Sequence, residues 1–177
     1  MATREGERSA DAAETEKSDE KDKMVIIAAS GDLDKAWPVL ILATTGAAYG
    51  MDVTVFFTFW GLGILKKPGT GPVGADWRQK MLSVFDRGGA EGLTLSKLNF
   101  GGLGAKFMQD LADEKNVASV QDLLTLAQQL GVKLWPCGMT MDLMGLEKKD
   151  MIDGLDEPAG AGSAISLMRD ASISLFI

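Results

Sequence analysis

The fold is decided by residues 24–58, which read MVIIAASGDLDKAWPVLILATTGAAYGMDVTVFFT. Met24–Ala29 is a short apolar run, which indicates a strand buried on both faces, as in a parallel sheet. Asp34–Tyr49 is mostly apolar and predicts a helix that Gly50 ends. Val53–Thr58 is β-branched and aromatic, which favours a second strand. Strand, helix and strand within about 35 residues form a βαβ unit, so we predict an α/β fold.

A membrane span is the alternative interpretation of this region, because residues 36–65 are largely apolar and Gly46–Gly50 matches a GxxxG pattern. Asp52, however, divides the apolar run into pieces of roughly 15 and 13 residues, and a span needs about 18. We therefore expect a buried helix followed by a buried strand, and no membrane span.

The rest of the chain continues the alternation of helices and strands. Ser119-Val120-Gln121-Asp122 is a helix start with an apolar face behind it, and Gly131 ends that helix. Residues 159–169 predict a helix rich in small residues. Further strands are expected at residues 132–135, 151–156 and 172–177. The resulting prediction is a three-layer α/β/α fold with a mainly parallel sheet of about five strands.

Composition divides the chain into a tail and a single domain. Residues 1–23 carry mixed charges and lack the apolar stretch of a signal peptide, so we expect a disordered charged tail. Residues 24–177 form the predicted α/β domain, with a helical insertion at about residues 66–115. Helices are expected there at 76–88 and 104–115. Three roles of this insertion stay open: it packs on the edge of the sheet, it contacts another copy of the chain, or it acts as a lid.

Two glycine-rich stretches of the insertion resemble phosphate loops only formally. Gly69–Gly74 matches GxGxxG, but it follows Lys-Lys-Pro and contains a second proline. The dinucleotide fingerprint requires a strand before the pattern and a helix after it. Gly101-Gly102-Leu103-Gly104 is equally weak. We expect no cofactor at either place.

Charge and composition exclude several kinds of chemistry. The 18 basic and 25 acidic residues give a net charge of −7, which disfavours a nucleic-acid partner. Histidine is missing, which rules out Ser-His-Asp and Cys-His catalysis and histidine-ligated metals. A single cysteine cannot form an internal disulfide, which fits a reducing, cytoplasmic setting. We expect no metal site.

That cysteine, Cys137, lies in a turn between a predicted strand and the short helix after it. In an open parallel sheet, ligands bind at the carboxyl ends of the strands, where the turns 30–32, 58–60 and 136–138 converge. A helix N-terminus favours a thiolate, and Gly138 leaves room beside the sulfur. The catalytic candidate is Cys137, and the candidate binding cleft consists of Ser30, Gly31, Thr58, Trp60, Gly138 and Thr140.

A packed, unreactive thiol is the alternative interpretation of Cys137. A lone intracellular cysteine next to methionine and leucine often behaves as a small buried hydrophobe. Its position at a strand-to-helix turn favours chemistry, whereas its apolar neighbours favour packing. The residues alone leave both open.

Three stretches resemble the DsrE/DsrF-like sulfurtransferase family, and specifically its DsrE2-type branch, which is sometimes labelled peroxiredoxin-like. They are the helix at 35–50, the string Phe56-Phe57-Thr58-Phe59-Trp60-Gly61-Leu62, and the string Cys137-Gly138-Met139-Thr140-Met141-Asp142-Leu143-Met144-Gly145. The resemblance covers residues 24–177. A peroxidase is not expected, because position 134 is leucine rather than threonine or serine and no second cysteine exists to resolve an oxidised one.

The resemblance implies a sulfur carrier or sulfurtransferase that assembles into trimers or hexamers. The family's cysteine, matched here by Cys137, takes a sulfane sulfur as a persulfide and hands it to an acceptor thiol. Sulfur-donor and acceptor proteins or small thiols are the implied partners, and whether the chain is itself an enzyme stays open. The alternative is a non-catalytic small-molecule-binding or assembly subunit of the same fold.

Overall fold

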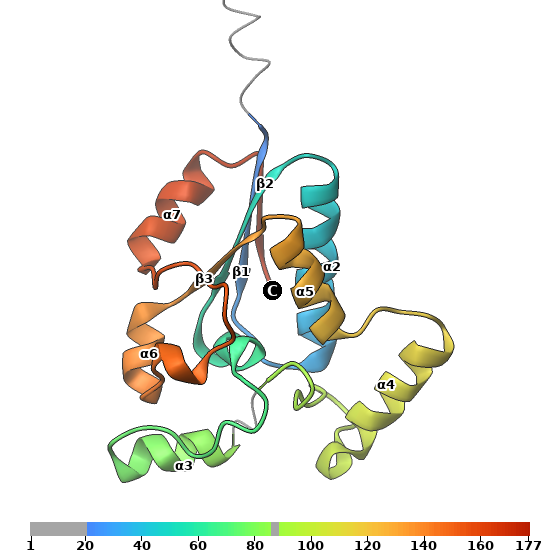
Figure 1. Ribbon diagram of the computed structural model, residues 1–177, viewed down its shortest axis with the longest axis vertical. Helices are drawn as coiled ribbons and strands as arrows, with labels where there is room; N and C mark the ends of the chain where they lie inside the picture. Colours follow the sequence, from blue (N-terminus) through green and yellow to red (C-terminus); the bar gives the residue numbers. More distant parts are fainter. Residues whose placement is uncertain (1–20, 86–88) are drawn as a thin grey trace, which may run out of the picture.

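The computed structural model describes residues 21–85 and 89–177 (Figure 1). Its sheet is parallel throughout, with the strand order β3-β2-β1-β4. The strands are β1 (Lys23–Ala28), β2 (Asp52–Phe57), β3 (Lys133–Pro136) and β4 (Ile173–Phe176). The α/β class and the parallel sheet are therefore confirmed. Ala28 pairs with Phe57 and Phe57 with Pro136, so β1, β2 and β3 end level with one another.

Helices cover both faces of the sheet (Figure 1). α2 and α5 pack against each other on one face, and α7 lies on the other. The α-helices are α2 (Leu33–Ala48), α3 (Trp77–Phe85), α4 (Leu103–Glu114), α5 (Val120–Gln129), α6 (Gly138–Met144) and α7 (Ala161–Arg169). Three 3₁₀ segments join them: η1 (Phe59–Leu65), η2 (Phe100–Gly102) and η3 (Lys148–Asp150). These are the three layers that the sequence predicts.

Alternation along the strands produces two apolar cores. Met24, Ile26 and Ala28 of β1 point into the core under α2 and α5. Val25 and Ile27 point into a smaller core under α7, because successive strand residues face opposite sides of a sheet. Cys137 belongs to this smaller core, so the thiol lies on the α7 side of the sheet.

The strand predicted at 151–156 is not formed, and the described part of the sheet has four strands rather than five. Met151 makes only an isolated antiparallel bridge with Lys66. The segment after it, residues 156–159, lies along the outer edge of β3 instead. The Asp156 N–H donates to the Leu134 carbonyl at 3.1 Å, and the Ala159 N–H donates to the Pro136 carbonyl at 2.9 Å. Pro158 has no N–H to donate, which keeps this pairing irregular.

The segment predicted as an insertion supplies α3 and α4, which lie at one end of the molecule (Figure 1). α3 begins and ends within the predicted range 76–88, whose residues 86–88 lie outside the described part. α4 matches the helix predicted at 104–115. Of the tail predicted at residues 1–23, residues 1–20 also lie outside the described part, and Lys23 already belongs to β1.

None of the helices in the described ranges has the length and apolar character needed to cross a membrane.

Candidate functional site

Backbone hydrogen bonds fix the turn that carries Cys137. The Cys137 N–H donates to the Phe57 carbonyl at 2.9 Å, which extends the pairing of β2 and β3 by one residue. The Cys137 carbonyl accepts the N–H of Met141 at 2.9 Å, which opens α6. Cys137 is thus the residue that caps α6, in an extended conformation. The sulfur is held where a strand ends and a helix begins, as the sequence predicts.

Two threonine hydroxyls meet beside this turn. Thr58 Oγ1, at the end of β2, lies 3.2 Å from Thr140 Oγ1 in α6. Thr140 is fully buried, and its oxygen also accepts the N–H of Phe59 at 3.3 Å. The contact between the two hydroxyls uses only one of their two protons. The other proton remains available to the sulfur of Cys137.

These groups bias the thiol toward its ionised form. Burial raises the pKa of Cys137, because a thiolate is poorly solvated in an apolar core. Hydrogen bonds from the hydroxyls of Thr140 and Thr58 and from the N–H groups of Thr140 and Met139 lower that pKa, and together they prevail. The net result is a pKa below the ordinary thiol value of 9.0. A buried group with this balance is a nucleophile candidate.

The thiol is nonetheless closed off from solvent, with only 2% of Cys137 exposed. Ala159 pairs with Cys137 in a parallel bridge, and its carbonyl accepts the N–H of Gly138 at 3.1 Å. We call residues 156–160 the covering segment. Its contacts with the turn are mostly backbone hydrogen bonds, so an external sulfur compound reaches Cys137 only when this segment or α7 moves.

The predicted cleft residues divide into two groups. Thr58, Thr140 and Gly138 lie around Cys137. Ser30 instead donates its hydroxyl to Asp32 Oδ2 at 2.9 Å and accepts the Asp32 N–H at 3.1 Å.

Gly31 and Trp60 belong with Ser30. A Cβ on Gly31 would lie 2.5 Å from the Trp60 carbonyl oxygen, so these two backbones pack directly together. The Trp60 side chain is about half exposed. The prediction of one continuous cleft is therefore replaced by two neighbouring turns, one around Cys137 and one around Ser30.

Phe59 is a site residue that the sequence prediction missed. Its N–H orients the Thr140 hydroxyl, and its backbone has a φ of +46°, which is unusual for a residue with a bulky side chain. A glycine at this position would have signalled such a conformation, but phenylalanine gives no such signal. The strained turn directs the Phe59 N–H into the site.

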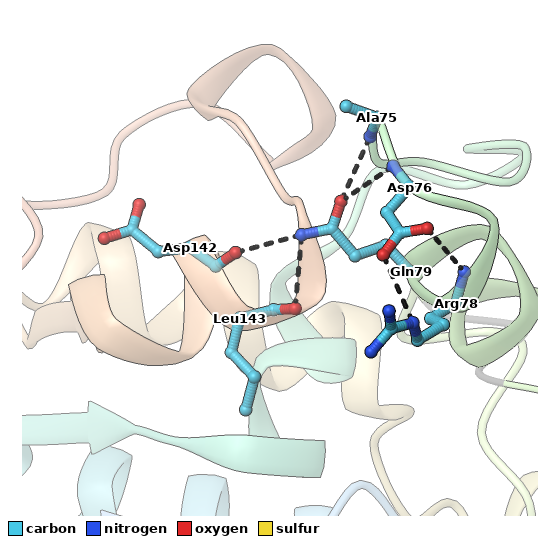
Figure 2. Close-up of polar contacts among 6 residues, drawn as sticks. All are labelled: Ala75, Asp76, Arg78, Gln79, Asp142 and Leu143. Carbon is cyan, nitrogen blue, oxygen red and sulfur yellow. Dashed lines mark hydrogen bonds and ion pairs between the residues drawn. The ribbon is translucent and has the colours of Figure 1, made fainter.

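Gln79 of α3 holds the far end of α6 (Figure 2). Its Nε2 donates to the carbonyls of Asp142 and Leu143 at 3.2 and 3.3 Å. Its Oε1 accepts the N–H groups of Ala75 and Asp76 at 3.1 and 3.3 Å. One amide therefore satisfies backbone groups at the end of α6 and at the beginning of α3. This contact links the insertion to the helix that Cys137 begins.

No cluster of three or more metal-ligating side chains occurs within residues 21–85 and 89–177. The chemical group that this arrangement offers is a buried thiol whose pKa is lowered by its polar neighbours.

Comparisons with known proteins point to one family. The chain matches the DsrE/DsrF/DrsH-like family over residues 20–176. It is 39% identical over 155 residues to the uncharacterized protein YrkE of Bacillus subtilis, covering 88% of this chain and 96% of that one. It is 38% identical over 170 residues to the sulfur carrier protein DsrE2 of Allochromatium vinosum, covering 89% and 99%.

Among solved structures, the ychN protein of E. coli matches with a TM-score of 0.50 at 14% identity, covering 88% of this chain and 99% of that one. This likeness concerns the fold. The family match and the two sequence relatives go further, and on them the chain belongs to the DsrE/DsrF/DrsH-like family.

Proposed function

We propose that this protein is a sulfur carrier that holds sulfane sulfur as a persulfide on Cys137 and passes it to an acceptor thiol. The observation that carries the proposal is the position of Cys137, which ends a strand and begins α6 next to the paired hydroxyls of Thr58 and Thr140. These neighbouring groups also lower the pKa of the thiol. A relative named as a sulfur carrier supports the same role. A thiol that only fills space does not need polar groups from two different segments beside it.

The transfer requires no redox partner. The Cys137 thiolate attacks the outer sulfur of a donor persulfide, forms a new S–S bond and releases the donor sulfur as a thiolate. Delivery is the same exchange in reverse, with the acceptor thiolate attacking the outer sulfur of the Cys137 persulfide. The threonine hydroxyls support both steps, because Cys137 is the thiolate nucleophile in the first and the thiolate leaving group in the second.

Donor and acceptor must reach a buried sulfur, so the proposal includes displacement of the covering segment. Donor and acceptor proteins or small thiols, a homo-oligomeric assembly and a reducing, cytoplasmic setting belong to the same proposal. A lone thiol stays available for exchange only where it is kept reduced.

The test is sulfur loading. The full-length protein is incubated with thiosulfate or polysulfide, and the intact mass is measured before and after a reducing agent. We expect the mass of one added sulfur atom, removable by reduction and absent in Cys137→Ser. Equal loading of parent and Cys137→Ser would refute the proposal.

The burial of Cys137 favours a second candidate, a binding or assembly subunit in which the thiol is only packed. The two candidates differ in the native alkylation rate. In a carrier, the alkylation rate of Cys137 rises with pH, with a midpoint at a pKa below that of a free thiol. A packed thiol is alkylated only when the protein is unfolded.

A further inference from the structure

The amphipathic helix α4 turns its apolar side away from the rest of the molecule. Leu103, Phe107 and Leu111 follow one another at helical spacing, and they are 73%, 70% and 38% exposed. Ala105, on the opposite side of the helix, is buried at 6%. Figure 1 shows α4 projecting at the lower right of the molecule, joined by a loop to the beginning of α5. An apolar row of this kind usually marks an interaction surface.

The charges of α4 indicate what kind of surface would cover this row. Lys106 lies in the first turn, and Asp110, Asp113 and Glu114 lie toward the end. This order opposes the helix dipole, which favours acidic residues at the beginning and basic residues at the end. Neither Lys106 nor Asp110 forms an ion pair within the described ranges. A second helix running the opposite way, with the same sequence, would supply the complementary charges.

We propose that α4 docks antiparallel against α4 of a second copy of this chain, around a two-fold axis that passes beside Phe107. In this arrangement Leu103 of each helix packs on Leu111 of the other. Lys106 and Asp110 lie one turn apart, on the same flank of the apolar row. A two-fold axis places this flank of one helix next to the same flank of the other helix. Each Lys106 then reaches Asp110 of the other copy, and each acidic helix end lies beside the other's positive N-terminus.

The exposed apolar area of α4 is small, so the α4 pair suits an interface that supplements other contacts between subunits. Three large apolar side chains, partly exposed, offer roughly 350 Å² per copy. Leu98 and Phe100, just before the helix, are exposed as well. Two copies together approach the lower limit of about 1,000 Å² for a specific interface. The α4 pair is therefore expected to join two subunits or two rings of subunits with moderate affinity, and it is independent of whether Cys137 carries sulfur.

The first test is a charge swap read by native mass at several concentrations. Lys106→Glu and Asp110→Lys each place like charges across the two-fold axis at both symmetry-related contacts, so each should weaken association about tenfold and halve the mass at low concentration. The double variant exchanges the two charges and should restore the parental mass. Identical masses for all four proteins, or a double variant that dissociates like the single ones, would overturn the proposal.

The second test asks whether α4 meets α4 rather than another surface. A residue beside a two-fold axis lies close to its own counterpart, so Phe107→Cys in a Cys137→Ser background should form a disulfide-linked dimer on mild oxidation. Leu126→Cys in the same background is the matched control, because Leu126 is exposed as well but belongs to α5, outside the proposed contact. Equal crosslinking of the two variants would contradict the proposal even if the charge variants changed the mass.

Discussion

The Ser30-Gly31-Asp32 turn and the Pro136-Cys137-Gly138 turn both leave the same edge of the sheet and lead into a helix. In the first, the Ser30 hydroxyl is satisfied two residues further on by Asp32. In the second, the groups that lower the pKa of Cys137 come from Thr58, just after β2, and from its own helix. The difference shows that lying at the carboxyl edge of a sheet does not by itself make a site. The Ser30 hydroxyl has already given its one proton to Asp32, so it has no proton left to donate to a thiolate or a ligand.

The helices after the two turns differ in the same way. α2 has 16 residues, and its buried side chains hold it against the sheet. α6 has 7 residues, too few to be stable without help. Gln79 from α3 supplies part of that help (Figure 2). The thiol therefore lies on the element that depends more on its neighbours.

The largest effect is expected at Gly61, which packs between Thr58, next to the cysteine turn, and the end of β1, just before the serine turn. The Gly61 N–H lies between the carbonyls of Thr58 and Ala29, and a Cβ on Gly61 would collide with the Ala28 carbonyl. Gly61→Ala should lower the free energy of unfolding by about 2–4 kcal/mol, because the clash is with backbone that cannot move aside. Urea unfolding measures this. Gly162→Ala in α7, where a Cβ meets nothing within 4 Å, is the control and should be neutral or slightly stabilising.

The next variant affects the cysteine turn alone. Thr140→Val removes a hydroxyl that donates to the thiol and leaves the Phe59 N–H without its acceptor. We expect the pKa of Cys137 to rise, so that alkylation requires a higher pH, and stability to fall by about 1–3 kcal/mol. The pH profile of the alkylation rate measures the first effect. Thr140→Ser keeps the hydroxyl and should keep the profile, and a Thr140→Val profile identical to the parent would show that the hydroxyl does not act on the sulfur.

A smaller effect is expected from loosening α6 at its far end. Gln79→Ala removes one amide that contacts four backbone groups in α6 and before α3. The cost should be about 1–2 kcal/mol, expressed as local opening of α3 and the end of α6 rather than as global unfolding. Hydrogen exchange at residues 141–146 measures it. Gln129→Ala, at the end of α5, is the matched control, and equal protection at 141–146 in both variants would mean that Gln79 does not hold α6.

Much of the fold was predictable because apolar runs and helix signals act over short distances. The βαβ unit of residues 24–58 and the helix start at residues 119–122 both appear as predicted, the latter as a capping box. The strand predicted at 151–156 was wrong for a tertiary reason. Met151 is buried in the main core and Ile152 and Leu155 pack against it, so their apolar character serves packing of a loop. Periodicity cannot distinguish that use from strand formation.

The positions of the candidate site residues were predictable only in part. The placement of Thr58 and Thr140 beside Cys137 follows from strand ends that converge and a helix that returns to them. The role of Phe59 depends on a backbone angle that its tertiary surroundings impose, and the covering segment depends on where a long loop comes to rest. Ser30 was grouped with the thiol because strand ends converge, whereas Asp32, two residues away, competes for the same hydroxyl.

The smallest effect is expected from Ser30→Ala, which separates the two turns most directly. The variant loses the contacts with Asp32, so the free energy of unfolding should fall by about 0.5–1.5 kcal/mol. The alkylation profile and the sulfur loading of Cys137 should stay unchanged, since the hydroxyl of Ser30 is committed within its own turn. If Ser30→Ala instead shifts the profile as Thr140→Val does, the two turns act as one site when the covering segment is open. The two turns would then be separate only while the covering segment lies over Cys137. With that segment displaced, they would form the continuous cleft that the sequence predicts.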